Sequence, residues 1–470
     1  LRRSRKGTRW DLILQVLVAY RLIAPGSEWK LHRHWFTSSA MADLLGGDFG
    51  LAEVHKLYAC HDRLLEHKDA LFTHLADRWR DLFNASFDVL LYDLTSTYFE
   101  INAADLPTDA KRRHGYSRDK RGDCPQLVIA LIVTPEGLPL AYEVLPGNTA
   151  DNTTLRSFLD KIEQQYGKAR RVWVMDRGIP TEAVLAEMRA SDPPVHYLVG
   201  TPKGRLSKLE ADLLDKPWHT VRQGVSVKLL PKDGELYVFA NSHDRVLKER
   251  AMRKRQLKGI WKRLTQLKTM TQSREDLLMR LGAARAKYPA GWRLVSVKVD
   301  KTDASFTFSL NRSKLRRVRS REGRYLLRTN LEGDDPALLW QYYIQLVAVE
   351  QAFKDLKGDL AIRPIFHQRE PRIEAHIFIA FLAYALFITL TRQLAALAPG
   401  LTARSALEKF AAVQMIDVHV PTTDGRALLL NRYTQPEPDL KIILNQLRIT
   451  LPPQPPPKIT AAQAENDPTL

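Results

Sequence analysis

Three stretches of this sequence decide its fold, and each carries one acidic residue in a strongly patterned context: FDVLLYDLTSTYFE (87–100), RVWVMDRGIP (171–180) and QYYIQLVAVEQAFKDLKGDLAIRP (341–364). Asp93 and Asp176 each follow an apolar, β-branched run that predicts a strand, and Glu350 lies on a segment with helical periodicity. Carboxylates that a fold brings together bind hard cations such as Mg²⁺. The three stretches therefore predict an acidic metal site on a sheet with a helix beside it.

Each acid also has a simpler explanation when it is taken alone. An Asp at the exit of a strand often forms a turn, which would account for Asp93, where the polar residues LTST are expected to end the strand, and for Asp176. Glu350 would then be a helix-surface acid paired with Lys354 one turn later. The recurrence of two such aspartates in one sheet favours a shared site.

The segment around Glu350 predicts one helix from about Asp335 to Lys357. Five residues fall on one stripe of this helix at spacings of three or four: Tyr343, Leu346, Glu350, Lys354 and Lys357. The adjacent stripe is apolar and is expected to pack on the sheet: Leu339, Tyr342, Val349, Phe353 and Leu356. Three carboxylates can hold two divalent ions for phosphoryl transfer, and the lysines would then face phosphate.

The charge of the chain is concentrated in one segment. The 470 residues contain 71 Lys and Arg against 53 Asp and Glu, a net charge of +18, and residues 201–330 alone contain 32 against 12. A basic patch of that size indicates a polyanionic partner, either nucleic acid or an anionic membrane. The same segment contains Trp218, Trp261 and Trp292, which are either core residues or flat surfaces for an unstacked base.

Other functional classes lack their signatures. Cys60 and Cys124 form neither a disulfide framework nor a CxxC motif, so a reducing, cytosolic setting is expected. The 13 histidines show no zinc spacing, and we expect His376, like His32, His34 and His114, to be a surface or hydrogen-bonding residue. The sequence contains no GxxxxGK[ST] loop, so it gives no indication of nucleotide hydrolysis.

The order of predicted elements gives an α/β fold with a mixed sheet and flanking helices. We expect a helical domain, a first part of the α/β core, a basic β-rich insertion, a second part of the core, and a C-terminal region: 1–84, 85–200, 201–330, 331–400 and 401–470. The insertion should contain strand pairs around one long basic helix from about Asp244 to Ala286. The Pro-rich last twenty residues are expected to be disordered.

Two apolar segments need separate interpretations. The segment that follows the basic start of the chain is broken by Asp11, Gln15 and Arg21, which indicates an amphipathic helix rather than a signal peptide. Residues 377–390 are nearly all apolar but too short to span a bilayer, so a buried core helix is expected. Because the chain begins with Leu rather than Met, we expect a fragment or a trimmed chain.

Together these motifs resemble the DDE transposases of bacterial insertion sequences, which have a ribonuclease-H-like core. The contexts of Asp93 and Asp176 are similar to those of the family, and Tyr343, Glu350 and Lys357 match a branch whose helix reads Tyr, two residues, Arg, three residues, Glu, six residues, Lys. Leu346 departs from this pattern, which puts one phosphate contact in doubt. Two further stretches resemble the same branch: 114–155, which includes GNTADN with Asn148 and Asp151, and 362–386.

The resemblance implies a cut-and-paste transposase that uses Mg²⁺, with Mn²⁺ as an alternative ion, held by Asp93, Asp176 and Glu350. It also implies a hairpin intermediate and DNA contacts from four residues: Tyr343, Lys357, Lys354 and Arg177. The partners would be terminal inverted repeats, target DNA and a second copy of the chain, at the nucleoid in the bacterial cytoplasm, with no membrane. The alternatives are a nuclease of the ribonuclease-H superfamily that does not join strands, and a catalytically silent, domesticated DNA-binding protein.

Overall fold

The chain forms two compact units. The computed structural model describes residues 7–101, 106–107, 110–167, 169–201, 209, 212–213, 215–332 and 335–460. The first unit comprises Leu1–Val174, Ile179–Val195 and Gln345–Leu470, and the second comprises Met175–Gly178 and His196–Ile344. The second unit is therefore larger than the expected insertion of residues 201–330.

The first unit begins with helices, as the sequence predicts. They are α1 (Trp10–Ile23), α2 (Glu28–Lys30), a π-helical turn (Leu31–Trp35), α3 (Met41–Leu45), α4 (Val54–Leu64) and α5 (Lys68–Phe83), with short 3₁₀ turns at Phe49–Leu51 and Leu65–His67. Ile13, Val16 and Leu17 of α1 are buried. The predicted helix is confirmed, and Gln15 is exposed on it, but Arg21 is buried at 3%.

The sheet of the first unit contains β1 (Val89–Tyr98), β2 (Gln126–Val133), β3 (Pro139–Pro146) and β4 (Val172–Met175), in the order β3-β2-β1-β4. β1 and β3 both pair with β2 in antiparallel fashion. The amide of Val172 donates to the carbonyl of Asp88 at 2.7 Å, where both β1 and β4 begin, so these two strands run in the same direction. α6 (Leu155–Tyr166) leads into β4 and α7 (Glu182–Ala190) follows it. The predicted mixed sheet with flanking helices is confirmed.

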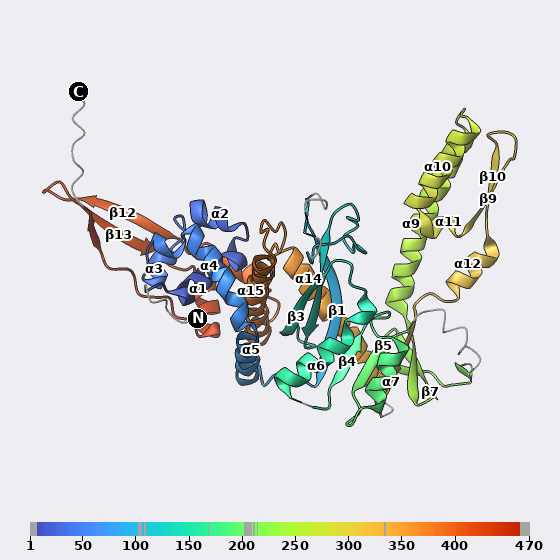
Figure 1. Ribbon diagram of the computed structural model, residues 1–470, viewed down its shortest axis with the longest axis horizontal. Helices are drawn as coiled ribbons and strands as arrows, with labels where there is room; N and C mark the ends of the chain where they lie inside the picture. The colour runs from blue at the N-terminus through green and yellow to red at the C-terminus, as the bar shows by residue number, and fades with distance from the viewer. Residues whose placement is uncertain are drawn as a thin grey trace. The chain divides into compact units, whose positions relative to one another are not determined.

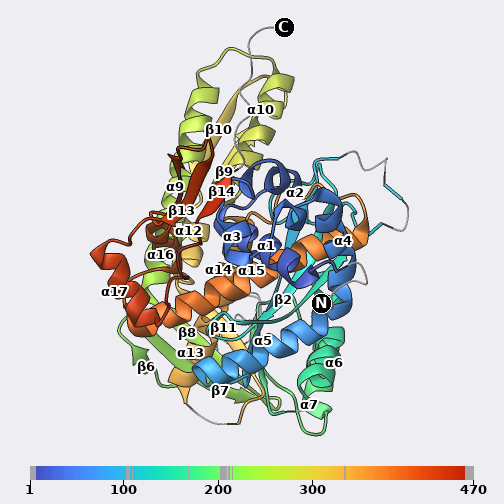
Figure 2. The ribbon, with the colours of Figure 1, turned by 90° about the vertical axis from the view of Figure 1, so that its left-hand side faces the viewer.

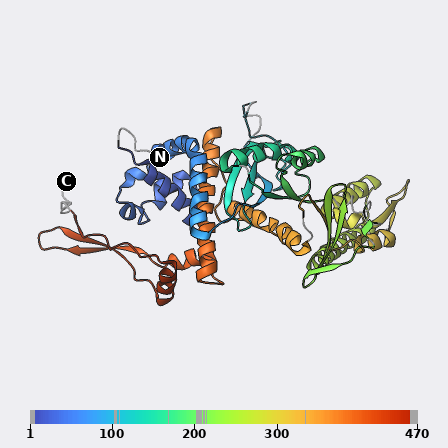
Figure 3. The ribbon, with the colours of Figure 1, turned by 90° about the horizontal axis from the view of Figure 1, so that it is seen from below.

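Two helices from the second half of the chain complete this unit. α14 (Leu346–Lys357) packs against β1 and β2 (Figure 1). α15 (Glu370–Leu397) contacts α1 and α4 and runs beside α5 (Figure 3). Tyr142 of β3 stacks on Phe381 of α15 with ring centroids 4.2 Å apart. By length and composition α15 could cross a membrane, but 61% of its most apolar stretch is buried inside the protein, as a core helix requires.

The C-terminal part of the first unit contains α16 (Ala403–Phe410), β12 (Met415–Pro421), β13 (Ala427–Tyr433), α17 (Pro438–Leu447) and β14 (Lys458–Thr460). β13 pairs with both β12 and β14. The Tyr433 hydroxyl donates to the carbonyl of Pro452 at 2.6 Å. The expected disorder is therefore wrong for residues 451–460, because this segment lies along β13. Residues 461–470, for which disorder was also expected, lie outside the described residues.

The second unit has its own antiparallel strands: β5 (His196–Gly200), β6 (His219–Arg222), β7 (Val225–Lys232), β8 (Glu235–Ser242) and β11 (Arg324–Thr329). Their order is β5-β11-β8-β7-β6. The unit also contains α9 (His243–Lys268), α10 (Arg274–Lys287), α11 (Pro289–Trp292), β9 (Val295–Val299), β10 (Phe306–Leu310), α12 (Arg312–Arg319) and α13 (Pro336–Ile344). α9, α10 and the β9–β10 pair share a core that includes Ile260, Leu281 and Phe306 (Figure 2).

Two predicted helices are each divided in two. The expected helix at 244–286 ends at Lys268, and α10 restarts where the Ser273 hydroxyl accepts the amide of Asp276, an N-cap that favours a new helix. The expected helix at 335–357 is interrupted at Gln345. α13 packs against β5 to β8, whereas α14 packs against β1 and β2, so tertiary contacts override the continuous periodicity.

Candidate active site

Asp93 lies within β1 and not at its end. The strand continues to Tyr98, and Asp93 is paired in register with Leu131 of β2. The expected break at LTST is wrong because Thr95, Ser96 and Thr97 are buried and pair with β2; β-branched threonine fits a pleated strand. Asp93 is half-buried, and its Oδ1 accepts the amide of Leu94 at 2.8 Å. Asp93 therefore does not form a turn.

Tyr92 anchors β1 on the opposite side of the strand from Asp93. Its hydroxyl donates to Thr154 Oγ1 at 2.7 Å. Burial raises the pKa of Tyr92 above its usual value, with the Thr154 hydrogen bond opposing the shift. Since successive side chains of a strand point to opposite faces, this buried anchor fixes the orientation of the neighbouring Asp93.

Glu350 is exposed in the middle of α14. Val349, Phe353 and Leu356 are buried on the packed side of the helix, as the apolar stripe predicts. Because α14 packs on β1, the helix that carries Glu350 is held against the strand that carries Asp93. Lys354, one turn after Glu350, is also exposed. Within the first unit, two of the three predicted acids thus lie on directly packed elements.

Lys357, a predicted DNA contact, forms an ion pair inside the protein. Its Nζ lies 3.1 Å from Asp119 Oδ1, and Arg363 binds the other oxygen of the same carboxylate at 3.0 Å. Burial lowers the pKa of Lys357, while Asp119 opposes the shift. Two cations share one carboxylate, so the group keeps a net positive charge.

The loop that carries Asp119 is held by a second ion pair. Arg118 donates to Asp151 Oδ1 at 2.5 Å, and the amide of Arg118 donates to Ser96 Oγ at 3.2 Å on β1. Asp151 begins a 3₁₀ turn (Asp151–Thr153) and also binds Arg118. The stretch 114–155 is therefore attached through Arg118 to β1, the strand that contains Asp93.

Asp176 and Arg177 belong to the second unit and are both exposed, directly after β4. Gly178 has a φ of +94°, a conformation that glycine adopts without strain. A Cβ atom on Gly200 would lie 3.2 Å from both Asp176 Oδ1 and the Arg177 amide nitrogen. The glycine at the end of β5 therefore leaves room for the Asp176 carboxylate.

Tyr343 lies in an aromatic cluster of the second unit. Its ring centroid is 5.7 Å from that of Tyr325 and 6.1 Å from that of Trp340. The guanidinium of Arg245 lies 3.8 Å from the centroid of the Tyr325 ring. Burial raises the pKa of Tyr343, and the charge of Asp176 adds to the shift. Because of the helix break at Gln345, Tyr343 belongs to α13 and Glu350 to α14, so the two residues do not share one helical stripe.

Basic residues of the second unit are exposed on α9 and α12. α12 contains five of them in eight residues with no acid: Arg312, Lys314, Arg316, Arg317 and Arg319. Among the three tryptophans, Trp218 and Trp261 are 45% and 42% exposed, whereas Trp292 packs against the α9–α10 core. The side chains of Lys258 and Lys262 line a shallow surface depression together with Trp261.

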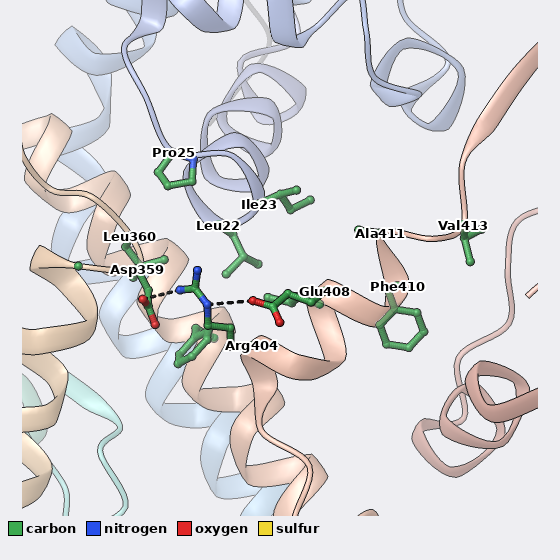
Figure 4. A pocket seen from close by; sticks show the side chains of 13 residues that line it. Leu22, Ile23, Pro25, Asp359, Leu360, Arg404, Glu408, Phe410, Ala411 and Val413 are labelled. Carbon is green, nitrogen blue, oxygen red and sulfur yellow. Dashed lines mark hydrogen bonds and ion pairs between the residues drawn. The ribbon is translucent and has the colours of Figure 1, made fainter. Parts of the chain in front are cut away.

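A cavity of about 620 Å³ lies elsewhere in the first unit, between the end of α1, the loop after α14, and α16 (Figure 4). Arg404 projects into it and forms ion pairs with Asp359 and Glu408. The other lining residues are mostly apolar, such as Leu22, Ile23 and Phe410. None of the predicted acids lines this cavity.

One buried group was missed by the sequence reasoning. Glu28, His61, His367 and His376 bring possible ligand atoms within 4.8 Å of one another. The expectation of a surface position for His376 is wrong, because it is 1% exposed; its hydrogen-bonding role is confirmed by a contact with Ile362. Burial, together with the charge of Arg21, lowers the pKa of His376 to about 4. Glu28 and His61 are about 300 residues before His367 and His376 in the sequence, so no local spacing could reveal the group.

Comparisons with known proteins place this arrangement in a family. A family model described as a transposase DDE domain matches residues 89–386, which include all three predicted acids. Among solved structures, the chain is similar to the cryo-EM structure of a piggyBac transposase synaptic complex with hairpin DNA, with 9% sequence identity, 86% of this chain and 72% of that chain covered, and a TM-score of 0.42. The comparison with curated proteins found no match.

The region that the family model matches indicates a metal-dependent DNA-processing enzyme. Because the family model matches more than half of the sequence, the chain belongs to the transposase DDE domain family. Its reaction class is therefore the metal-dependent cleavage and transfer of DNA strands.

Proposed function

We propose that the protein is a cut-and-paste transposase of a bacterial insertion sequence in which Asp93, Asp176 and Glu350 jointly hold two Mg²⁺ ions, with Mn²⁺ as an alternative. The main support is the packing of α14 on β1 within the region that the family model matches. The donor set fits hard cations, since it consists of carboxylates and the side chains of Asp176 and Glu350 are exposed. Like-charged carboxylates that share a site require such cations.

Bound ions would activate the attacking oxygen and stabilise the leaving oxygen of the phosphodiester. Water would attack at the end of the element, and the freed 3′-hydroxyl would be the nucleophile for the next transfer. A hairpin at the element end would be the intermediate before insertion. Arg177 and Lys354 are both exposed and would contact phosphate, and Tyr343 and Lys357 would border the same DNA.

The DNA partners would be the terminal inverted repeats and the target DNA. The basic second unit would follow the DNA backbone, because exposed cations release condensed counterions when they bind phosphate. The N-terminal helices would bind the repeats or pair two copies of the chain. A homodimer at the nucleoid in the bacterial cytoplasm would bring two element ends together.

The acids can be tested one at a time by Asp93→Asn, Asp176→Asn and Glu350→Gln, assayed for Mg²⁺-dependent cleavage of element-end DNA. Each variant should lose cleavage and keep nearly all DNA binding. Asp88→Asn is the matched control, because Asp88 is an exposed acid directly before the strand that contains Asp93. If one of the three variants cleaved at the wild-type rate, that residue would not be a metal ligand.

Two other functions give different results in the same assay. A nuclease without strand joining would cleave but would leave no product joined to target DNA. A silent DNA-binding protein would bind and do neither. The presence of an acid at all three positions favours the transposase over the silent protein.

A further inference from the structure

A second metal-ligand set lies in the helical part of the first unit. Glu28 lies in α2, His61 in α4, His367 in the segment before α15, and His376 in α15. These side chains are 4%, 0%, 7% and 1% exposed, respectively. A carboxylate and three imidazoles, all removed from water, converge on one point.

Hydrogen bonds orient two of the imidazoles towards Glu28. His61 Nδ1 lies 3.0 Å from the carbonyl oxygen of Leu57, and His376 Nε2 lies 3.3 Å from the carbonyl oxygen of Ile362. A carbonyl only accepts hydrogen bonds, so each of these nitrogens carries the proton. The opposite nitrogen of each ring faces Glu28. Histidine ligands of metals commonly have such a donor bond to a backbone carbonyl.

The charges around Glu28 leave imidazole lone pairs without a suitable partner. Arg21 already supplies one buried cation, with Nη2 4.0 Å from Glu28 Oε1. Protonating all three imidazoles as well would place four positive charges around one carboxylate, which burial makes very costly. At least one ring is therefore neutral and directs a lone pair at a carboxylate oxygen. Among the described residues, His61 Nε2 and His367 Nε2 have no hydrogen-bond partner, whereas His376 Nδ1 lies 3.4 Å from Arg21 Nη2.

The three distances from Glu28 to the imidazoles match the ligand–ligand distances around a tetrahedral ion, and all four ligand atoms lie within 4.8 Å of one another. Glu28 Oε1 lies 3.4 Å from His61 Nε2, 3.3 Å from His367 Nε2 and 3.3 Å from His376 Nδ1. Zn²⁺ binds nitrogen and oxygen at about 2.0–2.2 Å, and a tetrahedron with that distance from centre to vertex has edges of about 3.3–3.6 Å. We propose that Glu28, His61, His367 and His376 form a Zn²⁺ site separate from the DDE acids.

Four protein ligands make this a closed, structural site rather than a catalytic one. It would link α2 and α4 of the N-terminal helical part to α15 and to the segment that leads into α15 from α14. Arg21 Nη1 donates to the carbonyl of Ala361 at 2.9 Å, and Nη2 lies 3.4 Å from His376 Nδ1. Metal binding would therefore require Arg21 to give up its contact with His376 Nδ1. Its charge opposes metal binding, so Arg21 is the residue that separates a zinc site from a simple ion-pair cluster.

The test is the metal content of the full-length protein after exposure to Zn²⁺ and removal of free metal. We expect about one Zn²⁺ per chain, and in Co²⁺-loaded protein the visible absorption of a tetrahedral centre. His61→Gln and His367→Gln should each lose both signals. His55→Gln is the matched control, because His55 lies on α4 but is exposed, and it should keep them. Glu350→Gln should also retain zinc, which separates this site from the DDE acids.

Two further measurements test the proposal even if the histidine variants do not fold. In the wild-type protein, Zn²⁺ should raise the unfolding temperature and a strong chelator should reverse the increase. Arg21→Gln should bind Zn²⁺ at least as tightly as the wild type, whereas in a metal-free ion-pair cluster the same change would only destabilise the fold. Folded wild-type protein that retains no Zn²⁺ and shows no tetrahedral Co²⁺ absorption would overturn the proposal.

Discussion

Neutralising one face of α12 should weaken DNA binding in a salt-dependent way. Arg312, Arg316 and Arg319 are spaced by four and three residues, so they share one face of this helix. All three are exposed. The triple change to Gln keeps a similar helix propensity and removes three cations that would otherwise pair with DNA phosphates.

The size of the effect follows from counterion release. Each phosphate contact contributes about −0.9 to the slope of log K against log salt. Loss of three contacts should make the slope shallower by about 2.7. Between about 50 and 200 mM salt, the wild type should then lose roughly 40-fold more affinity than the variant.

The assay is equilibrium binding to element-end duplex DNA over a salt series, with circular dichroism as the check on folding. Lys314→Gln with Arg317→Gln is the control on another face of α12, and its slope should change by less. If the folded triple variant kept the wild-type slope, α12 would not contact the DNA backbone, and the basic charge of this helix would have another role.

Four further changes test individual positions. Leu346→Arg restores the residue expected in this family and should steepen the salt dependence by about one counterion; an unchanged slope would mean that Leu346 faces protein. Trp261→Ala should allow nicking but impair hairpin formation, because its exposed ring is flanked by lysines; equal effects on both steps, or on neither, would refute a base-holding role. Trp292→Ala should instead lower the free energy of unfolding by roughly 2 kcal/mol or more, measured in urea, since this ring packs on the α9–α10 core, and Trp218→Ala is the exposed control. Gly200→Ala should reduce cleavage without unfolding the protein, because the added Cβ would press on Asp176; full activity would show that the carboxylate has room to move.

Local sequence patterns predicted most of the helices and strands, because the formation of a helix or strand depends largely on neighbouring residues. The apolar runs before Asp93 and Asp176 form β1 and β4, and the apolar residues at 377–390 form the core of α15. Element boundaries were less predictable where tertiary contacts decide them. β1 continues through Asp93 because β2 offers paired residues as far as Gln126, and a sequence pattern in one strand does not reveal the length of its partner.

The family, the α/β class, the three candidate acids and the concentration of charge in residues 201–330 could all be recognised in the amino-acid sequence. Which distant residues meet became clear only from the folded chain. β11 pairs with β5 and β8, and His61 and His367 meet across about 300 residues of sequence. Such contacts depend on how whole elements pack. The periodicity of a segment records which face it buries, but not which partner covers that face.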